Sequence, residues 1–346
     1  MMQLDRLSAP FNIWWCIGVM SLSSASLCAQ PLIVDWYDEL DLPDLTFAYI
    51  DPNLGGAEVL WGGNDDLYCY YDEKSIYFGG FGQPNVFYSC YDGGGSFDDL
   101  VAAPYQLNGP RTWVWNRQSI ATPGYFLISF GPTELYNIPL IYPPGSEYAR
   151  CVLPDGQQLY IGGTSTDCSP QSDIVYRVEW PDIPWRTCLP HGAVSLELQM
   201  DTLLAIGFPT VTRLDAQSGA PMDSFDLFDG AANFYGKSCI RGDSLYWSCE
   251  ILGATHVGKY ILGVGPAWEQ TLPFAGAPVE LFQDDYGHLW TAVENSLIWM
   301  NTQTGAFDSI SYGTRINGMD LSAGSLLISG TLPDMQGFAL RATPTP

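Results

Sequence analysis

Residues 284–307 read DDYGHLWTAVENSLIWMNTQTGAF, and this stretch decides the fold. A polar turn that ends at Gly287 leads into the apolar run HLWTA. The segments NSLIWMNTQTG (295–305) and AFDSISY (306–312) continue the pattern of short apolar runs and turns. Short runs separated by turn residues, without a helical period, are typical of antiparallel β-structure. The stretch therefore predicts consecutive short strands joined by turns.

The same order of polar turn and apolar run recurs along the chain. The first apolar residues of the recurring runs are Ile76, Phe126, Leu159, Leu203, Leu245, Leu289 and Leu326. Their spacing averages about 42 residues, within the roughly 40–50 residues of a four-stranded propeller blade. We therefore expect an all-β fold, a β-propeller of seven four-stranded blades, in which each run is the second strand of its blade. Six or eight blades are the alternative, because the repeat is weakest near residues 101–145.

Two units resemble repeats of bacterial proteins. Residues 284–307 resemble the propeller repeat of bacterial sensor proteins through the opening D-x-x-G-x-L-W and the ending T-G-x-F. Residues 211–225, VTRLDAQSGAPMDSF, are similar to another bacterial propeller-type repeat, with RL, G and D-S-F in order. Each resemblance covers one unit of about 45 residues or fewer. The resemblance implies a β-propeller and names no activity.

The first 29 residues have the pattern of a secretory signal peptide. The apolar core FNIWWCIGVM (11–20) is too short to span a bilayer, and small residues follow it. We expect residues 1–29 to be removed and residues 30–346 to form a single propeller domain, secreted, at the cell surface or periplasmic. A lipid anchor at Cys28 and a buried N-terminal segment are the alternatives. No later stretch is long and apolar enough to be a membrane span.

The last repeat unit is one strand short. It supplies the segments 317–323, 325–331 and 337–343. A propeller must protect the edge where its first and last blades meet. We expect LTFAYI (45–50) to supply the outer strand of the last blade and so to close the ring. A separate N-terminal cap is the alternative.

The charge of the chain excludes some partners. It has 13 basic and 38 acidic residues, for a formal net charge of −25. Such a surface repels phosphate backbones and anionic membranes, so we expect no nucleic-acid partner. Cationic ligands, neutral glycans and divalent cations remain compatible with it. We expect a monomer that binds a protein or a glycan.

One short segment combines aromatic and basic residues in this acidic protein. Trp113 and Trp115 alternate in TWVWNRQ (112–118), so they share a face of the predicted strand. Arg111 and Arg117 flank them. These four residues are the predicted ligand surface.

Two other motifs have a structural interpretation. Trp247 and Trp290 recur near one repeat position, which favours packing between blades over stacking on sugars. Residues 241–243 read Arg-Gly-Asp, the tripeptide that integrins recognise. They fall where other units have turn residues such as Tyr286-Gly287, and glycine and aspartate favour tight turns. We interpret the tripeptide as a hairpin turn, with an adhesion ligand as the alternative.

Catalytic motifs are not evident in the sequence. The histidines, His191, His256 and His288, have no metal-ligand spacing, and no nucleophile elbow supports a serine hydrolase. We expect no cofactor and no metal site; calcium at the loop carboxylates of 91–99 is the alternative. The predicted function is non-catalytic recognition. The alternatives are a carbohydrate-active enzyme, a glycosidase or lyase with paired carboxylates in the channel, and a cell-surface adhesion or structural module.

Seven cysteines remain after residue 30, so at least one thiol is unpaired within the chain. Cys168 lies in the loop after LYIGG (159–163), and Cys188 ends the predicted outer strand of the same blade. In an antiparallel meander both positions lie at the same end of the sheet. We therefore predict a disulfide between Cys168 and Cys188, with two free thiols as the alternative.

Overall fold

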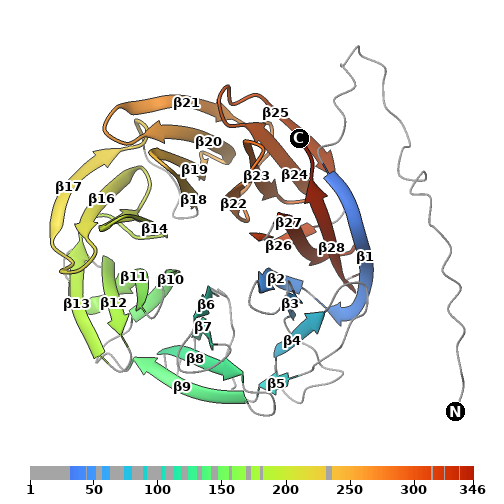
Figure 1. Ribbon diagram of the computed structural model, residues 1–346, viewed down its shortest axis with the longest axis horizontal. Coiled ribbons are helices and arrows are strands. Elements are labelled where there is room, and N and C mark those ends of the chain that lie inside the picture. The colour runs from blue at the N-terminus through green and yellow to red at the C-terminus, as the bar shows by residue number, and fades with distance from the viewer. Residues whose placement is uncertain are drawn as a thin grey trace, which may run out of the picture.

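The computed structural model describes residues 32–43, 45–51, 57–62, 74–79, 89–91, 103–105, 112–117, 124–130, 135–141, 147–155, 158–168, 173–179, 182–230, 236–312, 315–322, 324–334 and 336–346. In this part of the chain the strands form seven four-stranded antiparallel sheets, which lie around a common axis (Figure 1). The all-β prediction and the four-stranded repeat are confirmed. Residues 1–29, with the predicted signal peptide and Cys28, lie outside the described residues.

The sheets are numbered here in the order of their innermost strands. Sheet 1 contains β2 (Leu45–Asp51), β3 (Ala57–Gly62), β4 (Lys74–Gly79) and β5 (Ser89–Tyr91). Sheet 2 contains β6 (Ala103–Tyr105), β7 (Thr112–Arg117), β8 (Gly124–Phe130) and β9 (Leu135–Ile141). Sheet 3 contains β10 (Glu147–Asp155), β11 (Gln158–Ser165), β12 (Asp173–Glu179) and β13 (Asp182–Leu189), with the 3-10 turn η2 (Thr166–Cys168) after β11. Sheet 4 contains β14 (Ser195–Gln199), β15 (Thr202–Ile206), β16 (Thr210–Asp215) and β17 (Pro221–Asp226). Sheet 5 contains β18 (Gly236–Arg241), β19 (Ser244–Ile251), β20 (Ala254–Ile261) and β21 (Gly265–Thr271). Sheet 6 contains β22 (Leu281–Gln283), β23 (His288–Val293), β24 (Ser296–Asn301) and β25 (Phe307–Ser311). Sheet 7 contains β26 (Arg315–Ser322), β27 (Ser325–Thr331), β28 (Gln336–Pro344) and β1 (Leu32–Pro43).

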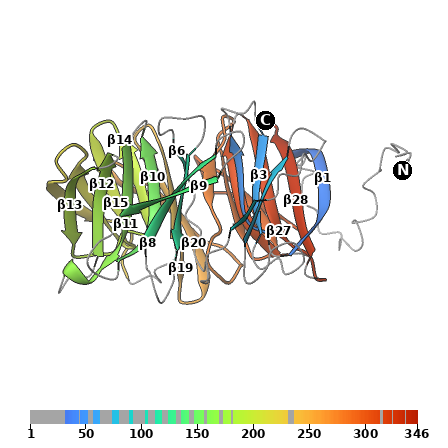
Figure 2. The ribbon, with the colours of Figure 1, turned by 90° about the horizontal axis from the view of Figure 1, so that it is seen from below.

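Sheets 1 to 6 are meanders whose strands follow one another outward from the axis, whereas the outer strand of sheet 7, β1, comes from the other end of the chain. In a meander, successive turns alternate between the two ends of the sheet. The turns between the first and second strands and between the third and fourth strands lie at one end, called here the hairpin end. The other turns and the connections between sheets lie at the opposite end, called the linker end. In the side view the strands run between these two ends (Figure 2). A hydrogen bond from Leu262 N to Asp243 O, 2.8 Å long, joins the two turns of sheet 5 at the hairpin end.

The prediction for the strand that completes the last sheet was wrong in its residues. The segment 45–50 lies in β2, the innermost strand of sheet 1, where it pairs with β3. The outer strand of sheet 7 is β1, which pairs with β28 from Leu32↔Pro344 to Pro43↔Gln336. The segment Leu45–Asp51 forms a hairpin with the next strand, Ala57–Gly62, and both are needed to complete the four strands of sheet 1. The strand one step earlier in the chain is then left for sheet 7.

The strand assignment also needs correction in the first two sheets. Ile76 and Phe126 were expected in second strands, but they lie in β4 and β8, the third strands of sheets 1 and 2. The other five markers lie in second strands, as expected. Both kinds of strand are central in a four-stranded sheet and follow a polar turn, so their local patterns are alike. Because Phe126 lies in a third strand and Leu159 in a second strand, the interval between these two residues is shorter than the average repeat.

The core lies between neighbouring sheets. Trp247 and Trp290 are both fully buried, which agrees with their interpretation as packing residues. They do not share one position, however. Trp247 packs with Phe208 and Phe228 from sheet 4 and its connection, whereas Trp290 packs toward sheet 7. Because strand side chains alternate between faces, an offset of one residue along the strand turns the ring to the opposite side of its sheet.

The D-x-x-G-x-L-W motif is held together by its first carboxylate. Asp284 is buried and accepts hydrogen bonds at Oδ1 from Tyr286 N (2.9 Å) and His288 N (2.8 Å). Its Oδ2 accepts from Trp290 Nε1 at 2.9 Å and lies 3.1 Å from His288 Nδ1. One side chain thus fixes the turn and orients the ring that packs between sheets. His288 is the first residue of β23.

A second recurring contact joins one sheet to the turn of the next. Trp185 Nε1 donates to Ala216 O over 3.1 Å, and Trp268 Nε1 donates to Thr302 O over 3.2 Å. The turns that supply these acceptors end in Gly219 and Gly305. A Cβ at Gly219, which has a φ of +70°, would lie 2.4 Å from the Trp185 ring, so only glycine fits there. The turn that ends in Ser218-Gly219 or in Thr304-Gly305 is therefore the part of the repeat against which the preceding sheet packs.

Candidate functional site

Three of the four residues of the predicted ligand surface at 111–117 lie in a described strand. Arg111 is outside the described residues. Trp113, Trp115 and Arg117 belong to β7, where Trp113 pairs with Ile128 and Trp115 with Phe126. Their use as a ligand surface stays a prediction.

The Arg-Gly-Asp tripeptide is a hairpin turn at the hairpin end. Arg241 closes β18 and pairs with Ser244, and Gly242 has a φ of +62° with nothing within 4 Å of a Cβ there. The backbone carbonyl of Asp243 accepts from Leu262 N, as that of Asp201 accepts from Ala216 N in sheet 4. The tripeptide thus occupies a recurring structural position, and its geometry needs no receptor.

Side-chain contacts tie this turn to the turns on either side. Gln199 Nε2 in sheet 4 donates to Gly242 O at 2.8 Å. Arg241 Nη2 pairs with Asp285 Oδ1 in sheet 6 at 2.6 Å. With the bond from Leu262 N to Asp243 O, these contacts join four hairpin-end turns from three consecutive sheets into one strip. Its exposed residues are Met200, Asp201, Arg241, Gly242, Asp243, Gly263, Val264, Asp285 and Tyr286, and we call this strip the hairpin-tip row.

The apolar members of the row project into solvent. Met200 is 86% exposed, Val264 82% and Tyr286 53%. Met200 also has a φ of 53°, in the left-handed region where a bulky side chain is uncommon. On the linker end, Leu252 is 98% exposed and has the same φ of 53°. The row has no signature in the sequence, because its members lie in four separate turns that belong to three consecutive repeats.

The innermost strands carry carboxylates as well. Glu197 on β14 accepts a hydrogen bond from Ser238 Oγ at 2.7 Å, and Ser238 Oγ also lies 2.8 Å from Ser195 Oγ. On the next residue of β18, Lys237 Nζ pairs with Glu280 Oε1 at 2.7 Å. Adjacent residues of a strand point to opposite faces. Glu197 and Glu280 therefore approach β18 from opposite sides.

Glu197 holds a proton more tightly than an ordinary glutamate does. Burial between β14 and β18 raises its pKa from 4.5 to about 8, and the charge of Glu280 raises it further. The hydrogen bonds from Ser238 and from the backbone of Ile240 lower it without cancelling the effect of burial. The carboxyl group is thus largely neutral at pH 7.

The described thiols that are not in a disulfide are Cys151, Cys239 and Cys249. Burial raises the pKa of Cys151 and of Cys249 to about 12, and raises that of Cys239 well above its ordinary value. Since the thiolate is the reactive form, these side chains are unreactive near neutral pH.

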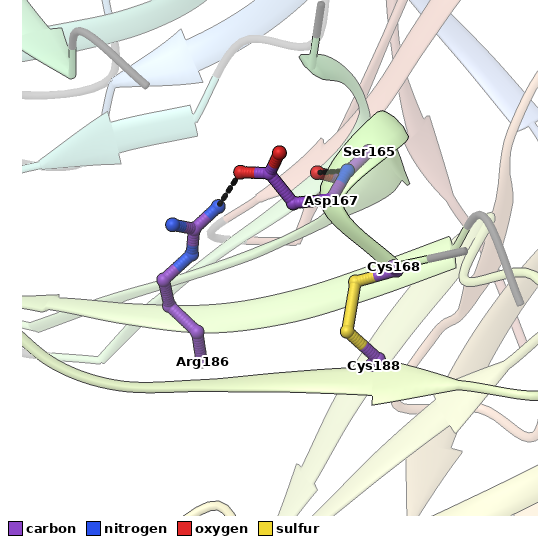
Figure 3. Close-up of a disulfide and its surroundings, with 5 residues drawn as sticks. All are labelled: Ser165, Asp167, Cys168, Arg186 and Cys188. Atoms are coloured by element: carbon purple, nitrogen blue, oxygen red, sulfur yellow. Dashed lines mark hydrogen bonds and ion pairs between the residues drawn. A yellow bond between two sulfur atoms is a disulfide. The ribbon is translucent and has the colours of Figure 1, made fainter. Parts of the chain in front are cut away.

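Cys168 and Cys188 are joined in the structure (Figure 3). Their Cα atoms are 5.4 Å apart, within the range that a disulfide requires. Cys168 ends η2, and Cys188 lies near the end of β13, so the bond ties a linker-end loop to the outer strand of the same sheet. Close by, Arg186 Nη2 lies 4.0 Å from Asp167 Oδ2, and Asp167 N donates to Ser165 Oγ.

The histidines do not converge on one site. His256 Nδ1 lies 2.9 Å from Glu269 Oε1, His288 is engaged by Asp284, and His191 is exposed at the linker end. Among the described residues, no group of three or more His, Cys, Asp or Glu side chains is placed to hold a metal ion. The same part of the chain contains no helix with the length and apolar composition needed to cross a membrane. The carboxylates of 91–99 named for calcium lie almost entirely outside the described residues.

Comparison with known proteins identifies the fold. No protein-family model matches the chain, and no curated protein matches its sequence. The crystal structure of BBS1N in complex with ARL6DN, soaked with mercury, is 10% identical, with a TM-score of 0.59 over 90% of this chain and 97% of that chain. The crystal structure of BamB from Moraxella catarrhalis is 11% identical, with a TM-score of 0.49 and the same coverage of 90% and 97%. Both are β-propeller proteins. At this identity the BBS1N likeness concerns the fold alone, and the fold is a β-propeller.

Proposed function

We propose that this protein is a secreted, non-catalytic recognition propeller that binds a protein or a glycan. Its ring has seven blades and is closed by the N-terminal strand β1. The seven four-stranded sheets and the pairing of β1 with β28 support this architecture. The protein acts as a monomer outside the cytoplasm.

The observation that carries the proposal is the hairpin-tip row. Its apolar side chains are exposed on turns that side-chain contacts join between sheets and backbone hydrogen bonds join within sheets. Clustered exposed apolar groups on a rigid scaffold are characteristic of recognition surfaces. The fold is compatible with this role, since BBS1N was crystallised in complex with ARL6DN.

The arrangement of the inner carboxylates argues against the enzyme alternative. A glycosidase needs two carboxyl groups that face one substrate at a defined separation. Glu197 and Glu280 approach β18 from opposite sides, and each is engaged by a residue of that strand. They stabilise contacts between blades in this arrangement.

A combined binding and hydrolysis screen tests the proposal. The purified protein, residues 30–346, is applied to a glycan array and to an array of extracellular proteins, and is incubated with chromogenic glycosides. We expect saturable binding to at least one array and no turnover. Turnover that Glu197→Gln abolishes, or the lack of binding on both arrays, would overturn it.

A further inference from the structure

We propose that the hairpin-tip row docks a basic protein segment in which lysine or arginine side chains flank apolar ones. The inference rests on the proposed function and narrows its ligand class from protein or glycan to a cationic, amphipathic protein surface. It follows from the shape, the stiffness and the charge of the row.

The apolar part of the row has no role in packing. Met200 and Val264 are each more than four-fifths exposed, so neither contributes much to the core. The backbone at Met200 costs free energy as well, because a left-handed φ favours glycine, asparagine or aspartate. An exposed methionine in that position is disadvantageous for the isolated fold.

The row is held rigid between blades. Gln199 fixes the carbonyl of Gly242, and Arg241 fixes Asp285. Within sheets 4 and 5, the hydrogen bonds from Ala216 N to Asp201 O and from Leu262 N to Asp243 O join the paired turns. Because these contacts already fix the turns, the backbone of the row loses little conformational entropy when a partner binds.

The charge of the row selects the partner. The Asp201 and Asp243 side chains are exposed between the apolar tips. Arg241, the cation beside them, is already paired with Asp285. The row therefore presents net negative charge on a protein whose net charge is −25. Complementary lysine or arginine side chains accelerate and orient docking on such a surface.

The same residues favour a protein over a glycan. Sugar faces stack on flat aromatic rings, and the row offers a single tyrosine, Tyr286, beside the aliphatic side chains of Met200 and Val264. Methionine adapts to irregular apolar surfaces, such as those of leucine or isoleucine side chains in a partner. The combination of aliphatic tips and carboxylates matches an amphipathic basic segment.

The test uses a fluorescent amphipathic peptide of lysine and leucine as the probe, with a lysine–serine peptide of equal charge as the comparison. Binding to the full mature chain is measured by fluorescence anisotropy at low and physiological salt. The apolar variant combines Met200→Asn, Val264→Ser and Tyr286→Ser. Its matched control is Leu252→Asn at the linker end, which removes an equally exposed side chain at the same φ. Asparagine tolerates that φ, so both variants are expected to fold.

We expect the lysine–leucine peptide to bind more tightly than the lysine–serine peptide. The apolar variant should weaken lysine–leucine binding about tenfold or more, a loss typical of removing interface anchors. Leu252→Asn should change it by less than about twofold. Asp201→Asn with Asp243→Asn should weaken binding and reduce its dependence on salt. Equal affinities for the wild-type chain and the apolar variant, or an equal loss in Leu252→Asn, would overturn the inference.

A second measurement separates this inference from the proposed function. Any ligand found on the arrays is tested against the same variants. If the ligand is a basic protein and the apolar variant loses it, both conclusions stand. If the ligand is a glycan, or if its binding is unaffected by the apolar variant, the row is not the docking surface, although recognition by the propeller stands.

Discussion

Replacing Asp284 with alanine is expected to lower the free energy of unfolding by about 3 kcal/mol. The carboxylate accepts from the buried Trp290 Nε1 at 2.9 Å, and a buried donor left without an acceptor costs about 1–3 kcal/mol. The backbone amides of Tyr286 and His288 lose their acceptor as well. These more exposed donors add about 1 kcal/mol together, by analogy with the loss of a helix cap. Urea denaturation followed by tryptophan fluorescence and far-UV circular dichroism measures the change.

Two further variants sharpen the measurement. Asp284→Asn keeps an oxygen for the turn amides but presents an NH₂ group, which cannot accept, to Trp290; about half of the loss should remain. Asp285→Ala is the matched control, since that neighbouring side chain is 78% exposed and loses only a surface ion pair with Arg241. It should cost less than about 1 kcal/mol. If Asp284→Ala is no more destabilising than Asp285→Ala, the assignment of Asp284 as the residue that holds the motif together is wrong.

Three other predictions concern stability. The pKa of Glu197 is about 8 in the folded protein, against an ordinary value of 4.5. Between these pH values the folded state holds a proton that the unfolded chain has released, so the free energy of unfolding should fall as the pH rises from 4.5 to about 8. Glu197→Gln should flatten this part of the pH–stability profile. Mass mapping of the non-reduced protein should recover the Cys168–Cys188 peptide pair, and the double serine variant should lose about 3 kcal/mol for a sequence separation of 20 residues; alkylation at both positions without reduction would contradict the pairing. Gly207→Ala should destabilise by about 3 kcal/mol or more, because its Cβ would lie 1.7 Å from Gly192 O; soluble expression with a wild-type melting temperature would contradict this.

The repeat was predictable because its signals are local. A turn followed by an apolar run identifies a central strand wherever it occurs, and the Asp284 motif contains its donors and its acceptor within seven residues. The same locality caused the errors. Second and third strands have similar patterns, so Ile76 and Phe126 were assigned one strand too early. A one-residue offset also places Trp247 and Trp290 on opposite faces, which a repeat alignment does not detect.

The candidate site was not predictable in the same way. The hairpin-tip row depends on the approach of four turns that belong to three consecutive repeats of the sequence. Met200 in a turn has no distinguishing pattern until its exposure is known. Glu197 was one of 38 acidic residues, and its pKa is raised by burial between β14 and β18, strands of two different sheets. These properties belong to contacts between blades, which no local pattern encodes.

The pairing of β1 with β28 has a consequence for synthesis. About 300 residues separate the two strands, and at roughly 5–20 residues per second a ribosome needs about 15–60 s to make them. Through that interval β1 has no partner, and its free backbone groups are open to pairing with neighbouring nascent chains. The strand LIVDWYDELDLP (32–43) is rich in aspartate and glutamate. Repulsion between like charges on two such strands keeps newly made chains apart until β28 emerges.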